Sequence, residues 1–175
     1  MNISIQGLNR ELLDWIPLKG SNQFTLCVSH CPGKFGSNSK KTQIQKDLKF
    51  LKNNNIQIIV SLLLKEELND LGLEDLFCSI KKFGFEHIHF PINDRSTPKN
   101  ISHFEELIFY LEEKIKNQGV VHIHCNAGIG RSGLLAALIC KKLNISNNPI
   151  EYVREFRKGA IETKSQENMV TSLFN

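Results

Sequence analysis

The chain is organised around one stretch, Val120-Val121-His122-Ile123-His124-Cys125-Asn126-Ala127-Gly128-Ile129-Gly130-Arg131-Ser132-Gly133. Its first five residues are rich in β-branched types and predict a buried strand. Three glycines then predict a tight turn, and the apolar run that follows Gly133 predicts a helix packed against a sheet. The turn between this strand and this helix therefore carries one cysteine at its start and one arginine at its end.

Length and composition place the chain among ordinary globular domains. Its 175 residues are 41% hydrophobic and 23% charged, which predicts one domain spanning residues 1–175 with a single core. The formal net charge of +4 suits an anionic substrate. It falls short of the dense basic clusters of dedicated nucleic-acid binders, so we expect no nucleic-acid partner.

Cysteine usage favours a reducing compartment. The five cysteines are odd in number and scattered, unlike those of a secreted disulfide scaffold. Cys27 and Cys31 lack a second Cys or His pair at zinc-site spacing, so we expect neither a metal nor another cofactor. The first residues match no secretion signal, and no apolar run is long enough for a membrane span. We therefore expect a cytoplasmic protein that does not contact membranes, or one delivered into a host cell if its source is a pathogen.

Strand and helix patterns alternate along the chain. Apolar or β-rich runs predict strands at 23–29, 56–64, 86–90 and 120–124. Helical periodicity predicts helices at 39–54, within 65–83, at 102–116 with Ser102 as the N-cap, after the glycine turn, and at 149–157 and 166–174. Residues 1–20 predict only a segment packed across the core. The alternation predicts an α/β fold: a mostly parallel sheet flanked by helices on both faces, with the 56–64 and 120–124 strands at its centre.

Three interpretations fit the glycine turn. The glycines alone predict only a tight connection between strand and helix. Residues 128–133 also match the dinucleotide fingerprint G-x-G-x-x-G, but that unit normally begins a fold, and Glu151 has no preceding strand to present it to a ribose. A Walker-type loop is excluded because Arg131 stands where its lysine belongs. The third interpretation, Cys-x5-Arg-Ser, accounts for the cysteine and the arginine as well.

Each position of Cys-x5-Arg-Ser suits phosphate chemistry. A five-residue loop can curl so that its backbone N–H groups point inward at three phosphate oxygens, at the N-terminus of a helix. The same groups stabilise a thiolate, so we expect Cys125 to be an ionised nucleophile at neutral pH. Arg131 offers a planar fork to two phosphate oxygens, and Ser132 can donate to the sulfur as it leaves. The predicted phosphate-binding residues are Asn126, Ala127, Gly128, Ile129, Gly130 and Arg131.

The motif His124-Cys125-x5-Arg131-Ser132-Gly133 resembles the signature of the cysteine-dependent protein tyrosine and dual-specificity phosphatases. Most of the remaining chain is similar to the kinase-associated phosphatase, or cyclin-dependent kinase inhibitor 3, family. The resemblance implies a protein tyrosine phosphatase-like fold, a phosphoprotein substrate and no metal. The similar segments are Cys31-Pro32-Gly33-Lys34-Phe35, the helix at 46–51, Ile56-Gln57, His89-Phe90-Pro91-Ile92-Asn93-Asp94 and Gly159-Ala160-Ile161-Glu162-Thr163.

The resemblance also implies a general acid and a residue that positions water. The family carries its acid in a loop upstream of the cysteine, where this chain has Asp94, although an aspartate here also suits an ordinary turn. Gln166 occupies the position of a glutamine that orients the hydrolytic water, although a solvent-facing glutamine fits the same helical pattern. Basic residues that could guide an anionic substrate, or simply be solvated, are Lys34, Arg95, Arg157 and Lys158.

The expected activity is hydrolysis of phosphotyrosine, with phosphoserine and phosphothreonine as a further class, through a phosphocysteine intermediate. Two alternatives stay open. An inositol phosphate or phosphoinositide phosphatase would profit from lysines in the loop, where Asn126 and Ile129 are uncharged. An inactive phosphoprotein-binding module would lack the cysteine, the arginine or the acid, all of which are present. We expect a monomer whose partner is a phosphorylated protein, with a protein kinase as one candidate.

One departure from the resembling family concerns oxidation. That family has a cysteine near the end of the strand that corresponds to 56–64, where this chain has Leu62, Leu63 and Leu64. No disulfide can join this position to Cys125. We therefore expect peroxide to inactivate Cys125 without that protection, unless another thiol is close.

Overall fold

A five-stranded sheet forms the centre of the computed structural model, which describes residues 13–18, 25–36 and 38–174. The strand order is β1-β2-β5-β3-β4. All neighbours are parallel except β1, which pairs antiparallel with β2. This confirms the predicted α/β class and its mostly parallel sheet. The strands are β1 (Asp14–Trp15), β2 (Leu26–Ser29), β3 (Ile58–Ser61), β4 (Glu86–His89) and β5 (Val121–His124).

The two predicted central strands lie in the middle of the sheet. β5 pairs with β2 on one side and β3 on the other, with Ile58 opposite Val121 and Ser61 opposite His124. All residues of β3 and β5 are buried, as expected for strands covered on both faces. The strand predicted at 56–64 is shorter than expected, because the chain leaves the sheet after Ser61 and enters a helix at Lys65.

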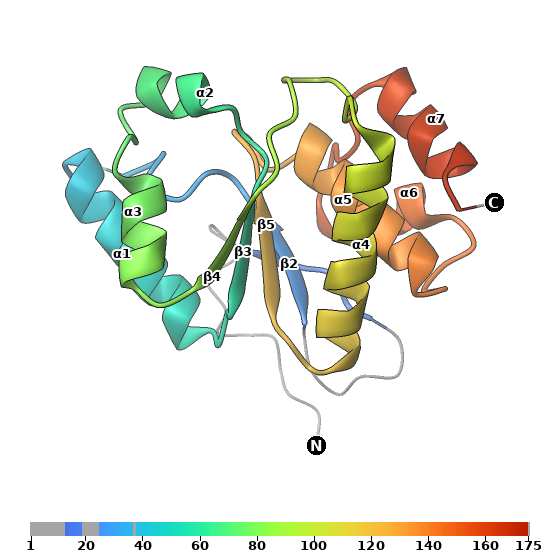
Figure 1. Cartoon of the computed structure of the whole chain (residues 1–175), viewed down its shortest axis with the longest axis horizontal. Helices are drawn as coiled ribbons and strands as arrows, with labels where there is room; N and C mark the ends of the chain where they lie inside the picture. The colour runs from blue at the N-terminus through green and yellow to red at the C-terminus, as the bar shows by residue number, and fades with distance from the viewer. Residues whose placement is uncertain (1–12, 19–24, 37, 175) are drawn as a thin grey trace.

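Helices cover both faces of the sheet (Figure 1), as predicted. On one face lie α1 and α3, and on the other α4, α5, α6 and α7, while α2 sits beyond the carboxyl end of β3. Leu48 and Ile59 belong to the apolar core of the first face, and Leu111 and Leu135 to that of the second. The helices are α1 (Lys40–Asn53), α2 (Lys65–Asp70), α3 (Leu76–Lys82), α4 (Ile101–Lys116), α5 (Gly130–Lys142), α6 (Pro149–Phe156) and α7 (Lys164–Ser172).

The helix that follows the glycine turn, α5, is the most buried of the helices. Every residue from Gly130 to Cys140 is buried, since α5 lies between the sheet and the helices α4, α6 and α7. A helix with apolar residues on all sides requires such a position. Its first turn therefore has a fixed place directly above the end of β5.

The predicted start is confirmed at one helix and is wrong at two others. Ser39 caps α1 by accepting the N–H of Thr42, as expected. The predicted N-cap Ser102 of α4 is wrong, because Asn100 accepts the N–H of His103 and the helix begins at Ile101. The last helix begins earlier than predicted, at Lys164, because Thr163 caps it.

The segment predicted to pack across the core is described only in part, since residues 1–12 and 19–20 lie outside the described residues. Its described part confirms the packing, because Ile16 and Leu18 belong to the core beneath α5. It also contains a strand that the sequence did not predict, β1, with Asp14 opposite Val28. Among the described residues, no helix is both long and apolar enough to cross a membrane.

Candidate active site

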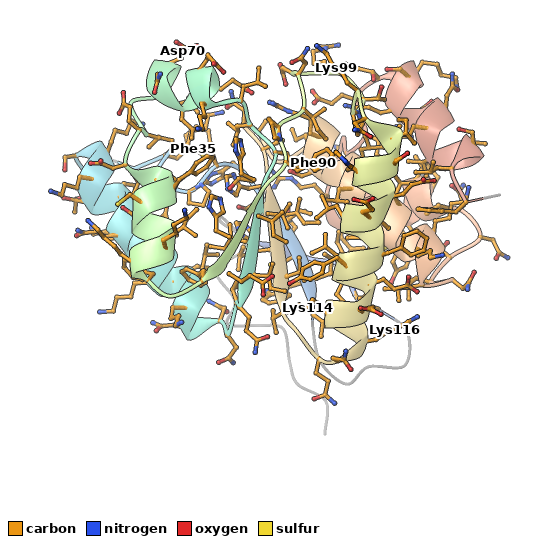
Figure 2. The ribbon with its side chains drawn as sticks, viewed as in Figure 1. Phe35, Asp70, Phe90, Lys99, Lys114 and Lys116 are labelled. Carbon is orange, nitrogen blue, oxygen red and sulfur yellow. The ribbon has the colours of Figure 1, made fainter. Side chains whose placement is uncertain are left out.

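The predicted site residues come together at the carboxyl ends of β3, β4 and β5. Cys125 directly follows β5, and the loop with Asp94 follows β4. This loop runs over the upper end of the sheet, between the Phe90 and Lys99 side chains of Figure 2. Parallel strands place their carboxyl ends at one edge, which is where open α/β sheets bind ligands.

The turn from Cys125 to Gly130 forms a closely packed loop around the cysteine sulfur. Cys125 is only 3% exposed, and the N–H of Gly128 donates to its Sγ at 3.2 Å. Gly128 has a φ of +71°, and a Cβ there would lie 2.1 Å from the backbone oxygen of Ser29. The glycine is thus required by both its torsion and its contact with β2. Because α5 begins at Gly130, its first N–H groups lie at the end of this loop.

Arg131 is held by two carboxylates. Its side chain is 1% exposed, and its two terminal nitrogens donate to the two oxygens of Glu67 at 2.6 and 2.8 Å. One of them also donates to the backbone oxygen of Ile92 at 3.0 Å, and the other to Asp94 at 2.9 Å. Burial acts most strongly on the pKa of Arg131 and would lower it, but the hydrogen bonds to Glu67, together with the charges of Cys125, Glu67 and Asp94, raise that pKa.

Glu67 is a site residue that the sequence did not predict. It lies 64 positions before Arg131, in α2, the helix that follows β3. Burial would raise the pKa of its carboxyl, but hydrogen bonds from Arg131 and from the Leu64 N–H hold it below its usual value. The only signal in the sequence is that Glu67 stands just beyond a buried strand.

Asp94 lies in the loop after β4 and contacts Arg131. Its side chain is 64% exposed, and its carboxylate reaches Arg131 at 2.9 Å. The loop that carries it is tied down by Gln166, whose Nε2 donates to the backbone oxygen of Ser96 at 3.0 Å. The Asp94 carboxylate thus contacts Arg131 while most of its side chain faces solvent.

Gln166 and Ser132 are both fully buried beside this loop. The Oε1 of Gln166 accepts the N–H of Glu162 at 3.0 Å, so both ends of its amide join segments of the chain. A solvent-facing Gln166 is therefore ruled out. The Ser132 hydroxyl has no hydrogen-bond partner within the described residues, so it is available as a donor beside the loop.

The four predicted guiding cations differ in position. Lys34 reaches the loop, since its Nζ donates to Asn126 Oδ1 at 2.5 Å. Arg95, with a φ of +56°, and Lys158 are exposed. Arg157 does not extend toward solvent, because its guanidinium donates to the backbone oxygens of Ala127 and Gly128.

A cysteine lies beside the loop, at a different position from the cysteine that the resembling family has near the end of the corresponding strand. Leu62 and Leu63 are buried, as the apolar pattern indicated. Cys31 is also buried, and its N–H donates to the backbone oxygen of Asn126 at 3.2 Å. Burial raises the pKa of Cys31, and the nearby Cys125 raises it further. Peroxide was expected to inactivate Cys125 unless another thiol lay close to it, and Cys31 is a candidate for that thiol.

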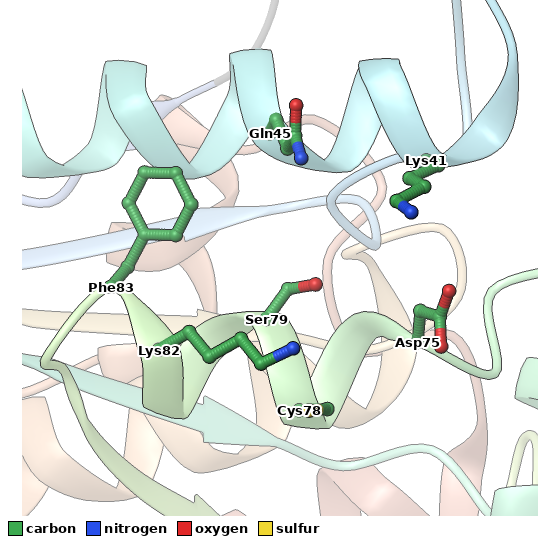
Figure 3. A pocket seen from close by; sticks show the side chains of 7 residues that line it. All are labelled: Lys41, Gln45, Asp75, Cys78, Ser79, Lys82 and Phe83. Atoms are coloured by element: carbon green, nitrogen blue, oxygen red, sulfur yellow. The ribbon is translucent and has the colours of Figure 1, made fainter.

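A hollow of about 240 Å³ lies elsewhere, between α1 and α3 (Figure 3). Its lining includes the exposed Cys78 and the two cations Lys41 and Lys82, and none of the predicted site residues. Among the described residues, no group of three or more His, Cys, Asp or Glu is placed to hold a metal ion. The candidate site is thus the loop at 125–130 with Glu67, Asp94 and Gln166 around it.

Comparisons with known proteins agree with this geometry. A family model described as "Polymorphic toxin system, DSP-PTPase phosphatase" matches residues 34–143. The chain is 35% identical over 164 residues to cyclin-dependent kinase inhibitor 3 of Rattus norvegicus, covering 89% of this chain and 75% of that protein. Its identity to the Homo sapiens protein is 34% over the same shares.

A solved structure extends the match to three dimensions. Kinase-associated phosphatase, crystallised with its catalytic cysteine replaced by serine, superposes with a TM-score of 0.80 and 31% identity over 90% of each chain. Identity and coverage of this extent go beyond a shared fold. The chain therefore belongs to the dual-specificity phosphatases of the protein tyrosine phosphatase class, and it is a cysteine-dependent phosphatase.

Proposed function

We propose that Cys125 is the nucleophile of this phosphatase and that hydrolysis proceeds through two displacements. In the first, the thiolate attacks phosphorus, an S–P bond forms and the P–O bond to the substrate breaks. In the second, water attacks the phosphocysteine and releases phosphate and the thiolate. The observation that carries the proposal is the hydrogen bond from the Gly128 N–H to Cys125 Sγ, in a loop whose far end holds Arg131 beside Asp94.

Arg131 and the loop amides bind the phosphoryl group in this scheme. The guanidinium is already oriented by its paired hydrogen bonds to Glu67, so little freedom is lost when phosphate binds. Charge that develops on the phosphoryl oxygens meets preorganised donors, which is the largest source of rate enhancement in many enzymes. Ser132, whose hydroxyl has no partner in the part of the chain that the structure describes, donates to the departing sulfur in the second step.

Asp94 serves as general acid and then as general base. Its carboxyl proton goes to the leaving oxygen in the first displacement, and its carboxylate takes a proton from the attacking water in the second. The exposure of Asp94 leaves it free to exchange its contact with Arg131 for one with the substrate. Gln166 holds the loop through Ser96, and a role in positioning water is part of the same proposal.

The proposed substrate is a phosphoprotein, with phosphotyrosine as the first class and phosphoserine or phosphothreonine as the second. Asn126 and Ile129 supply no charge inside the loop, and the Lys34 ammonium contacts the Asn126 side chain at its rim. This suits one phosphate better than several. Relatives named for cyclin-dependent kinases support a phosphorylated protein kinase as a partner.

Where the chain acts stays a prediction. The expectation of a cytoplasmic protein, or of delivery into another cell, gains support on the second point from the family description, which names a polymorphic toxin system. The monomeric state is likewise a prediction.

The test compares Cys125→Ser with Cys78→Ser on a small aryl phosphate. We expect Cys125→Ser to lose turnover and keep phosphate binding, and Cys78→Ser, which alters an exposed thiol of α3, to keep the parent rate. Asp94→Ala should lower kcat by about a hundredfold or more. Parent-like turnover by Cys125→Ser would rule out the mechanism.

A second measurement separates the substrate classes. The parent enzyme is presented with phosphopeptides and with phosphoinositides at equal phosphate concentration, and kcat/KM is compared. A preference for phosphoinositides would replace the phosphoprotein proposal with the alternative lipid substrate. Binding of phosphopeptides with zero turnover by the parent would instead indicate a binding module.

A further inference from the structure

Arg157 contacts the backbone of the loop at 125–130 from outside. It follows the last residue of α6, and its guanidinium makes three different hydrogen bonds. Nη2 donates to the Ala127 oxygen at 2.6 Å, Nε to the Gly128 oxygen at 3.0 Å, and Nη1 to Asp14 Oδ2 at 2.6 Å. All three of its nitrogens are therefore engaged, two of them with consecutive peptide groups of the loop.

The first of these peptide groups is the one that reaches the nucleophile. The peptide between Ala127 and Gly128 gives its oxygen to Arg157 and its N–H to Cys125 Sγ. A trans peptide is planar and its C=O and N–H point in opposite directions, so fixing the oxygen aims the hydrogen at the sulfur. A charged donor on the oxygen also polarises the group and strengthens the N–H bond on its other side.

The second peptide group is oriented in the same way. The oxygen of Gly128 accepts from Nε of Arg157, so the N–H of Ile129 points away from that guanidinium. This is the side where the phosphoryl oxygens would bind. One guanidinium thus sets the direction of two successive donors of the phosphate-binding loop.

Gly128 explains why such a restraint is needed. No residue with a Cβ fits there, because the backbone of Ser29 and His30 lies too close. Glycine is also the residue whose flanking peptide planes rotate most freely. Because the packing against β2 requires a glycine here, the peptide groups on either side of it can turn their N–H groups outward unless their carbonyl oxygens are held.

We propose that Arg157, oriented by Asp14, is a positioning residue that keeps the 127–128 and 128–129 peptide groups facing inward and thereby stabilises the Cys125 thiolate and bound phosphate. Both residues lie outside the stretch 34–143 that the family model matches. Asp14 belongs to the edge strand β1, so this strand becomes part of the catalytic apparatus. The inference rests on the proposed role of Cys125 as nucleophile.

The experiment measures the pH midpoint of iodoacetamide alkylation at Cys125 by peptide mass mapping, with the exposed Cys78 of each protein as an internal reference. The variants are Arg157→Met, Arg157→Lys and Asp14→Asn. Arg157→Lys keeps the charge, but an ammonium group lacks the planar fork that spans two oxygens and a carboxylate. We expect the midpoint to rise by about one unit in Arg157→Met, somewhat less in Arg157→Lys, and least in Asp14→Asn.

Inorganic phosphate binding and kinetics give the second readout. We expect the inhibition constant of phosphate to rise about tenfold in Arg157→Met, with kcat falling more than KM changes. Lys158→Met is the matched control, since it removes the same charge from the next, exposed residue. It should leave both the midpoint and phosphate inhibition at the parent values.

Two outcomes would overturn the inference. One is an unchanged midpoint in a folded Arg157 variant, whether Arg157→Met or Arg157→Lys, as judged by its circular dichroism. The other is an equal rise in Lys158→Met, because net charge alone would then explain the effect. The proposed function fails separately, if complete alkylation of Cys125 leaves turnover of the parent enzyme intact.

Discussion

At the scale of the residue, the glycines of the loop differ in what surrounds them. A Cβ at Gly128 would meet the backbone of β2 at 2.1 Å, at a φ of +71°. A Cβ at Gly130 would meet the end of the Glu162 side chain at 2.3 Å and Gln166 Nε2 at 3.3 Å, with no positive φ. The first neighbour is backbone and cannot move away, whereas the Glu162 carboxylate can rotate.

We therefore predict a large loss of stability for one alanine substitution and a small loss for the other. Gly128→Ala should lower the free energy of unfolding by about 3 kcal/mol or more and abolish measurable turnover, because both the torsion and the contact are violated. Gly130→Ala should fold with a loss of about 1 kcal/mol or less. Urea unfolding and aryl phosphate hydrolysis of the two variants check this, and equal losses would contradict it.

Asp94 and Gln166 were predicted from the family resemblance, whereas the residues that the chain's own pattern predicted lie close together in sequence. Cys125 and Arg131 stand in one turn, so their chemistry and spacing are visible together. Glu67 meets Arg131 only because β3 and β5 are neighbours in the sheet. Asp14 meets Arg157 across 143 positions, and no local pattern marks either contact. The missed residues thus depend on strand order, which the sequence left open.

At the scale of the element, the start of α4 shows how nearby capping residues compete. Asn100 and Ser102 both suit an N-cap, and they stand two positions apart. Asn100 accepts the His103 N–H at 3.1 Å, while Ser102 lies inside the first turn and is exposed. The bounds of long periodic segments were predictable, but the choice between two caps depends on where the preceding loop ends.

Two substitutions test which residue caps α4. Asn100→Ala should lower the free energy of unfolding by about 1 kcal/mol, because the His103 N–H loses its acceptor. Ser102→Ala should change it by less than about half of that, since alanine is the better helix former. Urea unfolding of the two variants measures both values, and a larger loss for Ser102→Ala would restore the cap predicted from the sequence.

The strands, like the helix caps, were predictable from the sequence only where their own residues carry the pattern. The runs at 56–64 and 120–124 were predicted as central strands because continuous apolar residues require cover on both faces, and the sheet confirms this. Asp14–Trp15 is too short for an alternating pattern, so β1 could not be recognised. Its existence depends on pairing with β2 through Asp14 and Val28 rather than on its own composition.

At the scale of the whole molecule, a row of serine and histidine side chains crosses the sheet. Ser29 of β2 and His122 of β5 share a hydrogen bond of 2.7 Å. Ser61 of β3 bonds His124 of β5 at 2.7 Å and His87 of β4 at 2.9 Å. Burial lowers the pKa of His122 to about 3 and of His87 to about 4, and holds that of His124 well below its usual value. These histidines are neutral in the folded protein at physiological pH.

This row predicts sensitivity to acid. In the unfolded chain the histidines take up protons near pH 6.5, whereas in the folded chain they resist protonation down to about pH 4 or below. Their contribution to stability is therefore complete above pH 6.5 and is lost as the pH falls below it. His122 alone should cost about 3 kcal/mol at pH 4.

Urea unfolding between pH 7 and pH 4 measures this loss. The free energy of unfolding should fall steadily as the pH drops below 6.5, and His87→Asn should reduce the slope, because one group fewer takes up a proton on unfolding. A free energy that stays constant down to pH 4.5 would contradict the prediction.

The edges of the sheet have a consequence for how substrates are recognised. Among the described residues the edge strands are β1, with two residues, and β4, with four. Beside β4, Tyr110 donates to Glu86 and Lys114 pairs with the same carboxylate at 3.2 Å. Many peptide-binding domains capture a partner by adding it as a strand to an open edge. Short edges bordered by charge are poor templates for such pairing. We therefore expect polypeptide substrates to contact the loops above the sheet rather than to pair with an edge strand, so their backbone need not be extended.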